Sequence, residues 1–438
     1  MLSFVYFQSA GSIIVALAIV AAPAPAQALQ PLAEFLAGAR TASVDNREAA
    51  MTAVEQQEEA LVALGRELPD VLVRGTYTRN QFAAVFPVQA QPGGPTMNLT
   101  IQPYDQWDLF LQADAPLIDF AGWARARATH RAAKAARYNV RATALEVQKQ
   151  VARQYYTLIG ADALRGSAQR TLAAAQSNAE LTRERRAGGV ATALDVERAQ
   201  AEVERARQNI ADAELQSELA RRALTTLTGV TASAEIGGSE DDLHAEAPLE
   251  KWEATPEATI PTLAAAAEQA RSAATNARAA RLSLIPTLTA TFVERVTNAT
   301  SFTGQPNYFT FTLNANWRLD LTTIASIRVQ SALAQISRIR EQRTRLAVRD
   351  QIYEAWQRTR TGIIKSQAAR AQARAADLAA QFATERYTNG AGTQLDVVQA
   401  QRDAFAAQVG RVQADADLAF ARTLLRLTAG VSIDQDQR

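Results

Sequence analysis

Two stretches of the chain, ERRAGGVATALDV at 184–196 and ERYTNGAGTQLDV at 385–397, share Glu-Arg, a glycine, a threonine and Leu-Asp-Val at identical spacing. They lie 201 residues apart, and at the same offset Tyr155 corresponds to Trp356. Self-similarity at a fixed offset is the signature of a duplicated structural unit. The chain is therefore predicted to consist of two repeats.

Each stretch predicts a turn between two helices. A glycine suits the left-handed turn that ends a helix, and a threonine three residues later suits the cap that starts the next one. An aspartate three residues beyond the threonine lies in the first turn, where the helix dipole favours a negative charge. The two sets are Gly189, Thr192, Leu194 and Asp195, and Gly390, Thr393, Leu395 and Asp396.

The prolines mark where long helices are possible. None of the 14 prolines falls within 117–247 or 307–438, and proline disrupts helix interiors. We expect long helices over about 119–187 and 322–388, each about 100 Å long at about 1.5 Å per residue, and returning helices over 192–229 and 393–430. The first returning helix has apolar and small residues at the 3-4 spacing of a coiled-coil seam: Val196, Ala199, Val203, Ala206, Ile210, Ala213, Ser217, Ala220, Leu224 and Leu227.

Each repeat also contains a shorter helix, at about 44–66 and 259–283, followed by two segments in which apolar and polar residues alternate. The alternating length of about ten residues is that of a tilted membrane strand, although an amphipathic hairpin on a soluble core has the same pattern. The loops between these strands are expected at 80–103 and 296–307. The apolar positions are Val71, Val73 and Tyr77; Trp107, Leu109 and Leu111; Leu288, Ala290 and Phe292; and Phe309, Phe311, Leu313 and Trp317.

The first 28 residues have the pattern of a signal peptide. An apolar run at 12–22 is too short to cross a bilayer and precedes Ala26-Gln27-Ala28, a small-x-small cleavage pattern. The expected organisation is a signal peptide at 1–28, a first repeat at 29–230, an acidic linker at 231–256 and a second repeat at 257–438.

Composition argues against several classes of function. Lys and Arg number 46 against 45 Asp and Glu, so charge gives no argument for nucleic acid as a partner. The sequence has no cysteine and only His130 and His244, which leaves few ligands for a metal. It contains no P-loop, nucleophile elbow, zinc-protease or dinucleotide motif. We expect no enzyme activity, no cofactor and no metal site.

The strands limit how the chain is assembled. Four strands per chain are too few to enclose a lumen, and open strand edges are not tolerated in lipid. If the strands are in a membrane, several chains must share one barrel, from which the helical hairpins extend as a hollow bundle.

The repeated Gly-x-x-Thr-x-Leu-Asp-Val turn, the proline before the first strand of each repeat (Pro69 and Pro286) and the Arg-containing helix end resemble the TolC family over nearly the whole mature chain. The resemblance implies a mainly α protein with β strands: a homotrimer with a 12-stranded β-barrel continuous with a periplasmic α-helical barrel. It implies an outer-membrane exit duct for efflux or type I secretion. Its partners are then a periplasmic adaptor and an inner-membrane transporter or secretion ATPase, and the membrane lipid surrounds the barrel.

The resemblance also implies roles for individual residues. The eight turn residues above would form the periplasmic gate and the adaptor-docking tips. Asp396 would belong to an acidic ring in the pore, where like charges raise at least one pKa. A second acidic ring is not expected, since the matching position is Gln399. Tyr387 would close the gate by contacting Asp195, without help from an arginine, because Gly392 occupies that position.

Alternatives remain for these residues and for the whole chain. Both aspartates serve equally well as helix caps without a gating role. Tyr104, Trp107, Tyr308 and Trp317 are expected to form an aromatic membrane girdle, or else to pack in a core. A periplasmic coiled-coil scaffold or adaptor without a pore is the competing interpretation of the chain, although adaptors usually have one hairpin, not two.

Overall fold

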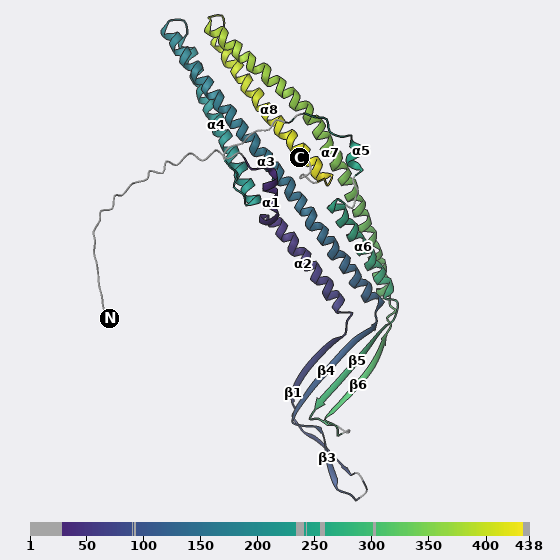
Figure 1. The fold of residues 1–438 in the computed structure, drawn as a ribbon. Coiled ribbons are helices and arrows are strands. Elements are labelled where there is room, and N and C mark those ends of the chain that lie inside the picture. The colour runs from purple at the N-terminus through teal and green to yellow at the C-terminus, as the bar shows by residue number, and fades with distance from the viewer. Residues whose placement is uncertain are drawn as a thin grey trace, which may run out of the picture.

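A computed structural model describes residues 29–431 except 90, 92, 234–240, 242, 255–258 and 301–303. The chain is elongated, with a layer of long helices at one end and a sheet at the other (Figure 1). The predicted signal peptide lies outside the described residues. The helices are α1 (Leu32–Ala42), α2 (Val44–Gly65), α3 (Phe120–Ala187), α4 (Ala193–Thr228), α5 (Leu249–Glu253), α6 (Pro261–Leu282), α7 (Leu321–Thr388) and α8 (Gln394–Thr428). The strands are β1 (Asp70–Arg79), β2 (Ala84–Gln89), β3 (Thr96–Gln102), β4 (Asp105–Ile118), β5 (Thr287–Thr297) and β6 (Asn307–Asn316).

The two predicted helical hairpins are confirmed. Helices α3 and α7 each have 68 residues, and α4 and α8 return along them from the two repeated turns. The hairpins lie side by side because α3 packs against α8. In the half nearer the sheet, α2 and α6 take the places of α4 and α8 beside the long helices (Figure 1).

The seam predicted for α4 is largely buried. Seven of its ten residues are buried: Ala199, Val203, Ala206, Ala213, Ser217, Ala220 and Leu224. Small side chains let helix backbones approach closely, so the hairpins are held by many short contacts instead of a few large side chains.

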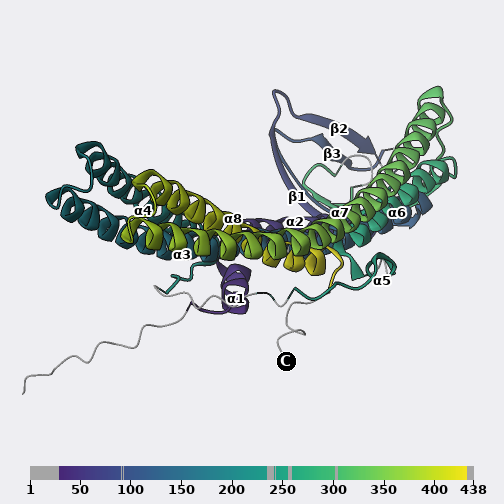
Figure 2. The same cartoon turned by 90° about the horizontal axis from the view of Figure 1, so that it is seen from above.

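Helix α1, which the sequence did not indicate, completes the largest cluster of buried side chains. Its Phe35 is fully buried with Leu158 of α3 and Leu224 of α4. The Phe35 ring lies 5.7 Å from the Tyr155 ring. Helices α1 and α5 both lie on the convex side of the curved long helices (Figure 2).

The predicted linker at 231–256 is partly ordered against α8 and α7. Arg422 is 5% exposed, and its guanidinium donates hydrogen bonds to Glu246 at 2.5 Å, to Asp241 at 3.1 Å and to the carbonyl oxygen of His244 at 2.7 Å. A buried arginine needs such partners, because the loss of hydration is costly without them. Acidic residues of the predicted linker therefore attach its described part to α8.

The four predicted strands form one antiparallel sheet in the order β1-β4-β5-β6. Cross-strand partners share a face of a sheet. Val73 lies opposite Leu111, and Phe292 lies opposite both Ala113 and Phe311. The apolar residues predicted from the alternation therefore lie on one face. Many of them are exposed: Val71, Val73, Tyr77, Trp107, Leu109, Leu111, Phe292, Phe309, Phe311 and Leu313.

The expected loop at 80–103 is wrong in part. It contains β2 and β3, which pair as a separate two-stranded sheet extending beyond β1 and β4 (Figure 1). Pro87, within β2, lacks a backbone donor and made a strand improbable from sequence. The strand forms because this hairpin has only two strands, so proline leaves no interior ladder interrupted.

No helix in the described part of the chain combines the length and the hydropathy that a membrane crossing requires.

Replacing Leu224 by Ala tests whether the cluster around α1 stabilises the helical part. The fully buried side chain leaves a cavity, so we expect a loss of about 2–5 kcal/mol in the free energy of unfolding. Leu219→Ala on the same helix is the control, because Leu219 is 62% exposed. Thermal unfolding followed by circular dichroism measures both, and equal losses would contradict the assignment of this core.

Candidate functional site

The two repeated turns lie together at the end of the helical layer farthest from the sheet (Figure 1). In each turn the threonine side chain accepts a hydrogen bond from the backbone N–H of the aspartate three residues later. The aspartate carboxylate accepts one from the threonine N–H, at 3.0 Å in the first turn and 2.9 Å in the second. These reciprocal bonds satisfy donors that a helix start leaves unpaired.

The backbone conformation explains why each turn contains a glycine. Gly189 has φ +74° and Gly390 has φ +78°. Residues with a Cβ rarely adopt this left-handed conformation. The glycine, threonine and aspartate of each motif therefore build the turn, as the sequence predicted.

The capping bonds set the protonation of both aspartates. The hydrogen bond from the Thr192 side chain holds the pKa of Asp195 below its ordinary value, and the backbone N–H of Thr393 does so for Asp396. The rise expected for Asp396 in an acidic ring requires neighbouring copies. Within one chain the pKa of Asp396 shifts in the opposite direction, so both carboxylates are ionised at neutral pH.

Arg185 joins the tips of the two hairpins. Its guanidinium donates hydrogen bonds to the backbone carbonyls of Tyr387 at 2.7 Å and Thr388 at 3.1 Å. It also lies 4.6 Å from the centre of the Tyr387 ring, a cation–π contact. One side chain from α3 thereby binds two carbonyls at the end of α7, of which that of Tyr387 also accepts from the backbone N–H of Gly390 at 3.0 Å.

The expected contact between Tyr387 and Asp195 is not formed within the chain. The Tyr387 hydroxyl is 3.4 Å from the hydroxyl of Thr182, which also bonds the Gln394 side chain at 3.2 Å. Tyr387 is 5% exposed, whereas the Asp195 carboxylate is held by Thr192. Tyr387 therefore links the two hairpins through Thr182 instead of Asp195.

Sequence reasoning missed Arg185, Thr182 and Gln394 as members of this site. Arg185 and Arg386 occupy matching positions of the repeat, but Arg386 bonds Ala391 of its own turn. The two arginines differ only in their surroundings, because Arg185 lies beside the end of α7 and Arg386 does not lie beside the end of α3 in the same way. A further link between the hairpins, the ion pair of Arg402 with Glu202, was also not predicted.

The four aromatic residues predicted as a membrane girdle divide into two groups. Tyr104, Trp107 and Trp317 are exposed, and the Trp317 indole N–H donates to the carbonyl of Leu284 at the helical end of the sheet, at 3.0 Å. Tyr308 lies opposite Arg295 in the sheet and bonds the Arg295 guanidinium at 2.9 Å. Tyr308 is therefore on the polar face of the sheet.

The polar face of the sheet carries paired charges and hydroxyls. Arg295 bonds Asp108 at 2.7 Å across β4 and β5, and Thr291 bonds Asp114 at 2.6 Å. The sheet thus has one apolar face, much of it exposed, and one hydrogen-bonded polar face. This is the distribution of a strand layer between lipid and water.

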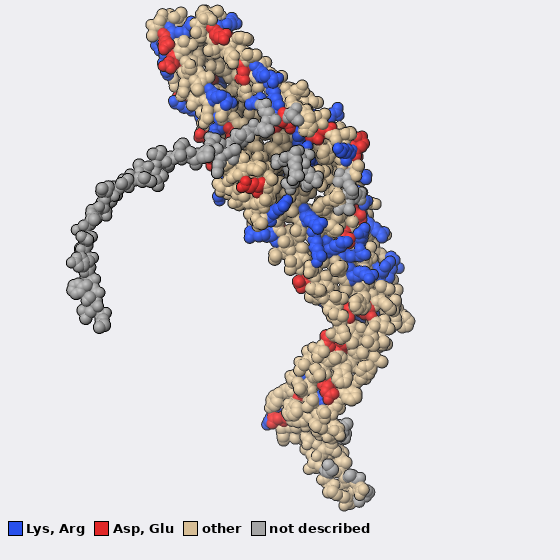
Figure 3. Space-filling model, viewed as in Figure 1, with Lys and Arg blue, Asp and Glu red and all other residues tan. Residues whose placement is uncertain are grey.

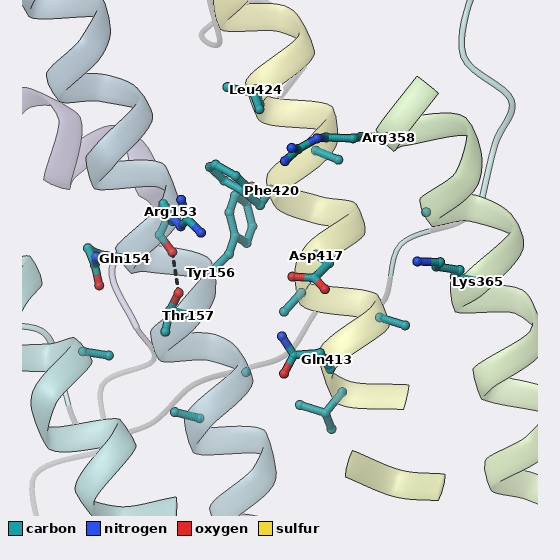
Figure 4. A pocket seen from close by; sticks show the side chains of 18 of the residues that line it. Arg153, Gln154, Tyr156, Thr157, Arg358, Lys365, Gln413, Asp417, Phe420 and Leu424 are labelled. Carbon is teal, nitrogen blue, oxygen red and sulfur yellow. Dashed lines mark hydrogen bonds between the residues drawn. The ribbon is translucent and has the colours of Figure 1, made fainter. Parts of the chain in front are cut away.

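A cavity of about 990 Å³ lies between the hairpins and is lined by α3, α4, α7 and α8 (Figure 4). On α7 its lining residues Arg358 and Lys365 are on the face opposite Trp356, whose indole bonds the linker at Ala247. The cavity therefore opens on the side of the helices away from α1 and α5. Arg153, Asp417 and Phe420 also line it, so its wall combines charged and apolar side chains.

In the described part of the chain no three His, Asp or Glu side chains gather in a way that could hold a metal ion.

The two helical hairpins and the four-stranded sheet form the fold of solved outer-membrane channels. One similar solved structure is the outer membrane channel CmeC of Campylobacter jejuni, with a TM-score of 0.77 and 15% identity over 92% of this chain and 86% of that chain. Another is the outer membrane protein VceC of Vibrio cholerae, with a TM-score of 0.75 and 18% identity over 92% of this chain and 96% of that chain. The outer membrane channel MtrE of Neisseria gonorrhoeae, solved in its open state, is also similar. Its TM-score is 0.74, with 19% identity over 94% of this chain and 91% of that chain. At these identities the likeness shows the fold. No curated relative matches the chain.

The chain belongs to the outer membrane efflux protein family, whose model matches residues 47–230 and 257–431. This confirms the resemblance to TolC-like channels and the two-repeat organisation of the fold.

Replacing Arg185 by Gln tests the link between the tips. We expect the two turns to separate, because Gln supplies neither the charge nor the forked donors that bind both carbonyls. The chain has no cysteine, so spin labels at Val190→Cys and Ala391→Cys report the distance between the turns. Arg386→Gln is the matched control, and an equal broadening of the distance distribution in both variants would contradict the special role of Arg185.

Proposed function

We propose that three copies of this chain close one twelve-stranded barrel in the outer membrane and form the exit duct of a tripartite efflux or type I secretion system. The observation that carries the proposal is a four-stranded sheet with an exposed apolar face, joined directly to helical hairpins about 100 Å long. Substrates would pass along the duct passively.

The sheet edges support closure between copies. β1 and β6 are the outer strands and run antiparallel to each other, since each neighbouring pair in the sheet is antiparallel. β6 of one copy therefore pairs with β1 of the next in the same alternating pattern. Three such junctions leave no edge in lipid, which removes the cost of unpaired backbone groups.

The two faces of the sheet support its orientation. The exposed apolar face carrying Val73, Leu111 and Phe311 contacts lipid, and the face carrying Arg295 and Asp108 lines the pore. The helices continue the duct into the periplasm, with the charged cavity between the hairpins on its inner wall and α1 and α5 on its outer wall.

The hairpin tips are the gate and the adaptor-docking surface in this proposal. They are farthest from the membrane, and contacts of Arg185 and Tyr387 connect the two hairpins there. Opening would break these contacts while leaving the turns intact, because each turn is stabilised by its own capping bonds. An adaptor and an inner-membrane transporter complete the conduit.

The competing scaffold interpretation predicts a different behaviour in membranes. A coiled-coil scaffold has no need of an apolar sheet face open to solvent, and such a face would promote aggregation. Washing membranes with carbonate or urea removes a scaffold, whereas a barrel remains until detergent is added.

The native mass of the mature chain extracted from outer membranes in mild detergent tests the proposal. We expect three copies, present only after detergent extraction, because the shared barrel exists only in a membrane-like environment. A monomer or dimer in the periplasmic fraction would overturn the duct and favour the scaffold.

Asp396→Ala tests the acidic ring at the gate. Three carboxylates around an axis attract cations, so their removal is expected to reduce divalent-cation block in planar-bilayer recordings. Asp195→Ala removes an equivalent capping bond in the first turn and controls for loss of the helix start. Unchanged block in Asp396→Ala, or equal changes in both variants, would remove the ring from the proposal.

A further inference from the structure

Basic residues are concentrated in the half of the helical layer next to the sheet. Between residues 120 and 145, α3 has six Arg or Lys and no Asp or Glu. Helix α6 has three basic residues and one acidic residue, and α7 up to 345 has five and one. The whole chain is nearly neutral, so this excess is local. Figure 3 shows the basic side chains over α6 and α7.

Five of these arginines line a groove of about 640 Å³ between α3, α6 and α7. Ser331 and Gln335 of α7 also line it. On α7 these two residues are 21 positions from Ile352 and Trp356, a spacing that returns to the same face of a coiled-coil helix. Trp356 contacts the linker segment on the convex side. The groove therefore opens on the convex side. Its arginines are Arg131, Arg271, Arg278, Arg281 and Arg338.

A single buried carboxylate neutralises part of this charge. Glu268 is 3% exposed and accepts from Lys134 at 3.0 Å and Arg271 at 2.9 Å, with Arg131 at 3.5 Å. Burial alone would raise the pKa of Glu268, but the hydrogen bonds from Lys134 and Arg271 hold that pKa below its ordinary value. Glu268 therefore stays ionised and fixes one wall of the groove.

The other three arginines have no such partner. Arg278, Arg281 and Arg338 are exposed, and no described carboxylate lies within 4 Å of any of them. Unpaired guanidinium groups that line a groove bind phosphate groups well, because their forked N–H donors match phosphate oxygens. The groove is thus complementary to an anion carrying phosphate.

The position of the groove selects the source of that phosphate. Arg281 is three residues from Leu284, whose carbonyl holds the exposed indole of Trp317 at the helical end of the sheet. Exposed tryptophans at a membrane boundary lie at the level of lipid headgroups. Three residues correspond to roughly 5 Å along a helix, so Arg281 lies at the headgroup level if the sheet is in the membrane.

We propose that this groove binds the phosphate of an anionic phospholipid from the periplasmic leaflet of the outer membrane, with Arg278, Arg281 and Arg338 as its ligands. The inference rests on the proposed membrane position of the sheet. Basic pockets beside membrane-spanning segments bind such headgroups in the same way. A bound lipid would fix the height of the helices against the membrane and compensate charges that otherwise repel.

Native mass spectrometry of the detergent-extracted full chain, titrated with phosphatidylglycerol or phosphatidylcholine, tests the site. We expect phosphatidylglycerol to bind preferentially and its affinity to fall at least tenfold in the triple variant Arg278→Gln, Arg281→Gln, Arg338→Gln. The control Arg222→Gln, Arg349→Gln, Arg374→Gln removes three exposed arginines elsewhere on the helices and is expected to bind as the wild type does. Arg281→Gln alone is the fallback if the triple variant does not fold.

Each other outcome overturns the inference. Equal loss in both triple variants would indicate an effect of net charge alone. Displacement of the lipid by millimolar inorganic phosphate would indicate a site for a free anion. Equal binding of both lipids would indicate nonspecific association. The proposed duct is tested separately. A monomer or dimer in the periplasmic fraction would overturn it, whatever the lipid titration shows.

Discussion

The unpaired backbone edges of β1 and β6 constrain everything else in this molecule. Each described edge strand pairs on one side only, and the apolar face beside it is exposed. A sheet of this kind is stable only when another sheet or lipid covers its face and another strand covers its edge. The proposed pairing of β6 with β1 of a second copy covers the edge, and the lipid around the proposed barrel covers the face.

The helical layer accommodates that arrangement with small side chains. Most seam positions of α4 are alanine, serine or valine, so helices approach closely without bulky interdigitation. The large buried side chains gather where α1 packs on α3 and α4. The long hairpins are thus anchored near their middle, and the polar contacts of Arg185 and Tyr387 join their tips.

The two repeats are similar in their turns and different in their cross-links. Arg185 reaches the other hairpin, whereas its counterpart Arg386 bonds its own turn. Within the hairpins, Asp162 of α3 bonds Ser217 of α4, but in the second hairpin the serine is on the long helix, as Ser366, and the aspartate is Asp415 on α8. The capping bonds join residues close in sequence, so a duplication of the sequence copies them. The side-chain links between helices depend on which residues lie on the neighbouring helix, and these differ between the two repeats.

The sequence by itself determined the repeats, the turns, the long helices, the apolar strand face and the family, because each depends on local periodicity or on residues a few positions apart. It did not reveal α1, the β2–β3 hairpin, the contacts of Arg185 or the pairing of Tyr308 with Arg295. The alternation in β6 puts Tyr308 and Phe309 on opposite faces, but only the register with β5 places Tyr308 beside Arg295. Tertiary structure decided these features, because they depend on which residues, distant in sequence, are brought face to face.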